Sequence, residues 1–115
     1  VNGRLQWFTL EGEHLHTLGG FLLPANVDTR NGLMLVPELE ARITLLDSNN
    51  EVVARFGDDA EWRTYVMKRE ARKHPEDCPA GKFLHPHDAC FDKDGNIFIA
   101  EWVATGRITK LRKLS

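Results

Sequence analysis

RLQWFTLEGEHLHTLG, at residues 4–19, and RITLLDSNNEVVARFG, at residues 42–57, align over sixteen positions without a gap. A third copy starts as RITKLR at residue 107. Each full copy has an apolar run, a turn rich in Gly, Asn and Asp, a second apolar run and a final glycine. This order predicts a β-hairpin, because tight-turn residues separate two strand-like segments.

A second repeated element precedes the hairpin. LPANVD at 23–28 leads to Asn31-Gly32 and then to LMLVPE at 33–38. HPHDACFD at 85–92 leads to Asp94-Gly95-Asn96 and then to IFIAE at 97–101. Both corners have tight-turn residues between apolar runs. The complete unit is four short strands in roughly 35–40 residues, which is the length of one β-propeller blade.

The pattern therefore predicts an all-β chain of about two to two and a half four-stranded propeller blades with one short helical insertion. Within a partial propeller spanning 1–115, we expect a half blade at 4–19, a blade at 24–57, a helical insertion at 58–82, and a C-terminal blade lacking its last strand at 84–114. Propellers have roughly 4–8 blades. The chain is then part of a longer protein, or several copies assemble; we expect a homo-oligomer, and a trimer gives six blades.

The insertion begins with Asp58 and Asp59 and is basic near Lys73, a distribution that favours a helix along this segment. Pro75 is expected to end it. We therefore expect a short helix over one rim of the blades, which serves either as a cap or as a lid over a substrate site.

The composition of the chain excludes some classes of binding partner. The chain has 115 residues, 42% hydrophobic and 28% charged, which is typical of a folded protein. A net charge of −2 provides no basic field for nucleic acid, and no run reaches the roughly 18 apolar residues of a membrane span. Two cysteines are too few for a disulfide framework. We expect Cys78 and Cys90 to be free, with Cys90 packed as a small apolar residue. Localisation is not predicted.

The stretch FLHPHDACFDKDGNIFIAEW at 83–102, with GRITKL at 106–111, resembles the NHL-repeat β-propellers. It is most similar to bacterial proteins related to the amidating lyase that acts on peptidyl-α-hydroxyglycine. The resemblance covers 4–57 and 83–114 and implies a six-bladed ring, of which this chain is about the C-terminal third.

The resemblance also implies two metal ligands. A Pro-His pair opening an innermost strand supplies a zinc ligand in that lyase, and an aspartate after such a histidine holds a structural calcium. His87 and Asp88 match this pattern. Their equivalents one repeat earlier are Ala25 and Asn26, so a single copy offers one such histidine. Zinc needs about three protein ligands, which copies of His87 around a ring would supply.

Two functions remain open. One is a binding scaffold for a peptide, a protein or a small ligand, and the alternative is a metal-dependent lyase or hydrolase with a channel zinc. No catalytic side chain is assigned. The candidate binding residues are His85, Glu101, Trp102 and Arg107.

Each of these candidates has a structural interpretation as well. His85 precedes a proline and is expected to face the rim or solvent. Glu101 and Glu38 occupy one repeat position and are expected to pair with Arg107 and Arg42, or to act as acid and base. Trp102 is interpreted mainly as an aromatic residue packed within the blade.

Overall fold

The computed structural model describes residues 2–68 and 70–114. In this part of the chain, nine strands form three antiparallel sheets, accompanied by one α-helix and two short 3-10 helices. The prediction of a mainly β chain is confirmed at this level. Within the same residues, no helix is long and apolar enough to cross a membrane.

The three sheets follow one another along the chain. The first contains β1 (Arg4–Phe8) and β2 (His14–Gly19). The second has the order β3 (Asp28–Arg30), β4 (Leu33–Glu38), β5 (Arg42–Leu46) and β6 (Val52–Phe56). The third has the order β7 (Pro86–Phe91), β8 (Ile97–Glu101) and β9 (Arg107–Leu111).

The hairpins predicted from the repeat are formed. β1 pairs with β2 and β5 pairs with β6, both antiparallel. Even the irregularity recurs, since the register shifts between Trp7 and Phe8 and again between Leu45 and Leu46, the same two repeat positions. A shared bulge indicates that the two segments have the same local geometry as well as similar sequences.

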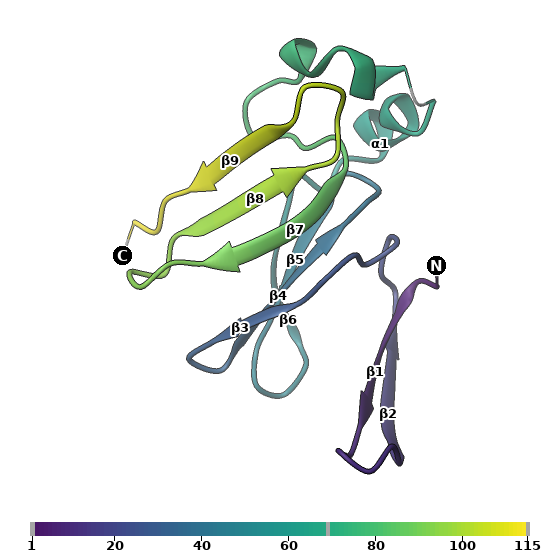
Figure 1. Cartoon of the computed structure of the whole chain (residues 1–115), viewed down its shortest axis with the longest axis vertical. Helices are drawn as coiled ribbons and strands as arrows, with labels where there is room; N and C mark the ends of the chain where they lie inside the picture. The colour runs from purple at the N-terminus through teal and green to yellow at the C-terminus, as the bar shows by residue number, and fades with distance from the viewer. Residues whose placement is uncertain (1, 69, 115) are drawn as a thin grey trace.

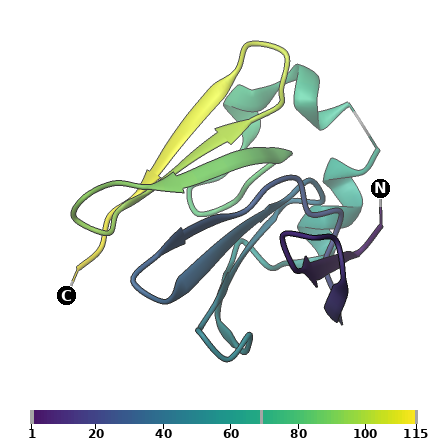
Figure 2. The same ribbon diagram turned by 60° about the horizontal axis from the view of Figure 1, so that its bottom comes forward.

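The sheets lie side by side in chain order, and the two termini lie on opposite sides of the molecule (Figures 1 and 2). An apolar cluster fills each junction. Between the first and second sheets, Leu5 and Leu18 pack against Phe21, Val36 and Leu46. Between the second and third sheets, the buried residues are Leu35, Ile43, Leu45, Phe83, Ala89, Ile97 and Ile99. Burial of these alternating faces positions one sheet against the next.

The insertion lies at one end of the sheets (Figure 1) and is less helical than predicted. Helix α1 (Ala60–Val66) begins after Asp59, whose carboxylate accepts a hydrogen bond from the Trp62 N–H at 3.0 Å. The expected continuation towards Pro75 is wrong, because the helix ends at Val66 and the chain resumes as 3-10 helices at Ala71–Lys73 and Pro75–Asp77.

Packing explains the early end of the helix. Val66 and Ala71 are both buried in one cluster with Leu84 and Val103. Five residues apart on a helix of about 3.6 residues per turn, they would point to different sides. The chain must leave the helix for both to reach this cluster.

Both cysteines are free, as predicted, but Cys90 is exposed and the expectation that it is packed is wrong. Cys90 lines a pocket on β7, β8 and β9 together with Phe98, Ala100 and Ile108. A strand pattern identifies two faces but does not say which of them another sheet covers.

Candidate binding site around Trp102

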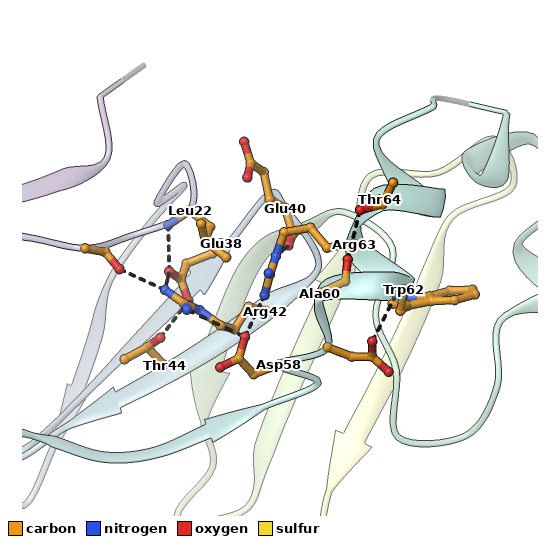
Figure 3. A network of polar contacts seen from close by, with 12 residues as sticks. Leu22, Glu38, Glu40, Arg42, Thr44, Asp58, Ala60, Trp62, Arg63 and Thr64 are labelled. Atoms are coloured by element: carbon orange, nitrogen blue, oxygen red, sulfur yellow. Dashed lines mark hydrogen bonds and ion pairs between the residues drawn. The ribbon is translucent and has the colours of Figure 1, made fainter.

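The repeated glutamate forms a buried polar cluster in the second sheet (Figure 3). Oε1 of Glu38 accepts hydrogen bonds from the Leu22 N–H at 2.8 Å and from Nη2 of Arg42 at 2.7 Å. Its Oε2 accepts from Nε of Arg42 at 2.9 Å and from the Thr44 hydroxyl at 2.6 Å. The predicted pairing with Arg42 is confirmed, and with both oxygens engaged Glu38 is a structural residue.

Glu101 occupies the same place in the third sheet with a looser arrangement. Its Oε1 accepts from the Leu84 N–H at 2.6 Å, as Glu38 does from Leu22. Its Oε2 lies 3.2 Å from Nη1 of Arg107, which confirms that the two pair. Within the described residues, neither of these two atoms completes a well-aligned hydrogen bond. Burial raises the pKa of the Glu101 carboxyl, and the Leu84 N–H and Arg107 oppose the shift.

The two glutamate–arginine pairs differ because the loops that connect their strands differ in length. Arg42 follows Glu38 by four residues, whereas Arg107 follows Glu101 by six. With the longer connection, Arg107 makes one contact with the Glu101 carboxylate, whereas Arg42 donates two hydrogen bonds, from Nε and Nη2, to the Glu38 carboxylate. Glu101 and Arg107 therefore hold the third sheet together, and their side chains are not aimed at a common ligand.

His85 does not face the rim or solvent as expected; it is buried, with 9% of its surface exposed. Its Nδ1 lies 2.9 Å from the Leu39 carbonyl oxygen. Because a carbonyl only accepts, Nδ1 donates, and Nε2 of the neutral ring is left as an acceptor. Within the described residues Nε2 has no partner. Burial lowers the pKa of His85, because it disfavours the charged ring relative to the neutral one.

The two predicted metal ligands lie on the exposed start of β7. The His87 ring packs edge-on against Trp102, with 5.9 Å between ring centroids. Oδ1 of Asp88 accepts hydrogen bonds from Nδ2 of Asn26 and from the Ala89 N–H, both at 2.8 Å. Asp88 thus links β7 to the segment that precedes β3, a contact that no sequence pattern predicted.

Among residues 2–68 and 70–114, one group of three potential ligand side chains comes together, namely His74, Glu76 and Asp77, all exposed. It contains neither His87 nor Asp88. Zinc at His87 and calcium at Asp88 stay predictions.

Trp102 is 61% exposed, so its interpretation as a packed aromatic residue is wrong. Three pockets, of about 310 to 350 Å³, meet at its side chain. One is lined by His87, Ala100 and Glu101, and another by Arg72, Lys73, Val103 and Ala104. The third is lined by Leu23, Leu39, Met67, Arg72 and His85. We call these residues with Trp102 the Trp102 surface.

The Trp102 surface combines three kinds of contact. The indole offers an exposed aromatic face. The guanidinium of Arg72 lies 5.8 Å from the ring centroid, within cation–π range. Leu23, Leu39 and Met67 supply an apolar wall. This set suits a ligand that has an apolar or aromatic part and an anionic group, and nothing in it constitutes a nucleophile paired with a base.

Sequence reasoning selected Trp102 and His85 and missed Arg72. That arginine lies in the insertion and reaches the third sheet because the Ala104 N–H donates to the Arg72 carbonyl at 2.9 Å. No spacing or motif connects residues so far apart in the chain.

No family model, no curated protein and no solved structure matches this chain.

Proposed function

We propose that the three sheets are successive blades of an NHL-type β-propeller, and that the chain is a binding scaffold whose ligand contacts the Trp102 surface. The structural repeat supports the first part. Glu38 and Glu101 accept from the backbone N–H groups of Leu22 and Leu84, which are equivalent in the repeat. Likewise, the Leu39 N–H donates to Leu23 as the Trp102 N–H donates to His85.

Exposure of Trp102 carries the second part of the proposal. A large aromatic side chain left 61% exposed among three pockets, with Arg72 beside it, is the composition of a recognition surface. A peptide or protein segment with an acidic residue next to an apolar one fits its charge and apolar wall. Metal-dependent lyase chemistry is the second candidate, supported by the exposed position of His87 within this surface.

Selection of random displayed peptides on the immobilised chain tests the binding proposal. We expect enriched acidic and apolar sequences whose affinity falls about thirtyfold or more in Trp102→Ala, because truncating an aromatic anchor costs about 2 kcal/mol or more. Arg72→Gln should weaken the acidic binders selectively. Leu15→Ala, at a side chain 62% exposed on β2, is the matched control.

Failure to enrich any peptide that depends on Trp102 would contradict the binding proposal. Metal analysis of the purified chain and of His87→Ala tests the second candidate. Stoichiometric zinc that is lost in His87→Ala would favour the lyase, and the same metal content in both would contradict it.

A further inference from the structure

The two junctions between sheets use equivalent residues. Leu5 of the first sheet packs towards Leu46 of the second, and Ile43 of the second sheet packs in the cluster that Leu111 of the third sheet adjoins. Leu5 and Ile43 are equivalent in the repeat, as are Leu46 and Leu111. Phe21 and Phe83 are also equivalent and each belongs to its junction's cluster. One mode of sheet packing thus occurs twice in the chain.

The third sheet presents the same face again, and no sheet formed by the described residues covers it. Ile108 is the equivalent of Ile43, yet Ile108 is 70% exposed and Ile43 is fully buried. Phe98 takes the position of Leu35, and Lys110 lies over its ring, 5.4 Å from the centroid. Cys90, Phe98, Ala100 and Ile108 line one pocket on this face, which we call the open face.

The opposite end of the molecule carries the complementary position. Phe8 of β1 is the repeat equivalent of Leu46 and Leu111, the residues that meet the preceding sheet at each junction. Leu46 is fully buried, whereas Phe8 is 52% exposed. The chain forms this sheet-to-sheet junction twice internally. The open face and Phe8 have the residues of its two opposing sides, and both are exposed.

We propose that the open face of one chain packs against the β1–β2 hairpin of a second copy, with Ile108 of one copy meeting Phe8 of the other. This rests on the proposal that the sheets are successive propeller blades. Because the two surfaces differ, the contact is head-to-tail and continues to a closed ring when the rotation allows it.

Sedimentation of the full chain over a range of concentrations tests the interface. We expect wild type to associate with increasing concentration, and Ile108→Asp and Phe8→Asp each to sediment as a monomer. Val53→Asp, at a β6 side chain 54% exposed, introduces the same charge elsewhere and should associate like wild type. Circular dichroism at low concentration checks that the exposed substitutions leave the fold unchanged.

Mixing the two defective variants gives the sharper result. Phe8→Asp keeps an intact open face and Ile108→Asp keeps an intact hairpin, so a head-to-tail contact forms once between them. The mixture should stop at a heterodimer of twice the chain mass. A mixture that remains monomeric, or wild type that remains monomeric at every concentration, would overturn the proposal.

Cys90 reports on the same face without any substitution. Alkylation of Cys90 should slow several-fold as wild type associates, while Cys78, which lies beside the Lys82 carbonyl, serves as the internal control. Association with no change at Cys90 would also overturn the assignment. Peptide binding through Trp102, measured on monomeric Ile108→Asp, is a separate readout, so failure of the interface and failure of the ligand site are distinguishable.

Discussion

At the scale of single residues, the same repeated glutamate position has two different hydrogen-bonding environments in the molecule. Glu38 and Glu101 share a repeat position, a backbone donor and an arginine partner. Glu38 has both oxygens fully engaged, whereas one oxygen of Glu101 lacks an aligned partner among the described residues. Burial raises the pKa of Glu101. The sequence predicted both glutamate–arginine pairs. The six-residue spacing between Glu101 and Arg107 loosens the second pair, and this effect depends on the path of the longer loop in the folded chain.

His85 makes stability depend on pH. Burial lowers its pKa below the ordinary value of 6.5, so the unfolded chain takes up a proton more readily than the folded one. The resulting stability is complete above pH 6.5 and is lost as pH falls through the lower, folded-state pKa. The stability of wild type to urea should therefore decrease as the pH falls from about 8 to about 5.

His85→Gln should flatten this dependence, because an amide can still donate to the Leu39 carbonyl but does not titrate. The raised pKa of Glu101 has the opposite sign, since protonation in the folded state adds stability as pH falls. The difference between wild type and His85→Gln isolates the histidine. His16→Gln, at an exposed ring, is the control, and equal slopes for wild type and His85→Gln would contradict the assignment.

At the scale of elements, the hairpins followed directly from local sequence, whereas the insertion did not. Turn residues and alternating apolar positions act within one hairpin and can be recognised in the chain. The end of α1 depends on Val66 and Ala71 reaching the same buried cluster, a contact with Leu84 and Val103 that no local pattern contains. Charge distribution along 58–73 is compatible with both outcomes.

Gly57, which follows β6, allows Phe83 to approach the backbone closely because it has no Cβ. Its φ is +70°, and a Cβ placed there would lie 2.6 Å from Cδ2 of Phe83. Gly12, in the first hairpin's turn, has φ +95° and nothing within 4 Å of such a Cβ. Gly12→Ala should cost about 1–2 kcal/mol for backbone strain alone.

Gly57→Ala should cost that strain and roughly 1–3 kcal/mol more, because Phe83 must shift within a packed junction. Urea unfolding monitored by circular dichroism compares the two variants. Equal losses would mean that Phe83 moves freely and that the close approach has no structural role.

At the scale of the whole molecule, equivalent residues differ according to what covers them. Ile43→Ala removes a fully buried side chain between the second and third sheets and should cost about 2–5 kcal/mol. Ile108→Ala, at the equivalent position on the open face, should change the stability of the dilute monomer by no more than about 0.5 kcal/mol. Urea midpoints at low concentration measure both, and a large loss in Ile108→Ala would show that its side chain is covered within one chain.

The sequence by itself determined the strands, the hairpins and the glutamate–arginine pairs, because each depends on turn chemistry, on alternation or on charges at repeated strand positions. Only the tertiary structure decided which faces are covered. It placed Arg72 beside Trp102, buried His85 against the Leu39 carbonyl, and left Cys90 and Ile108 open. Covering a face is a relation between sheets distant in the chain, and a period of two along a strand is the same whether or not another sheet lies above it.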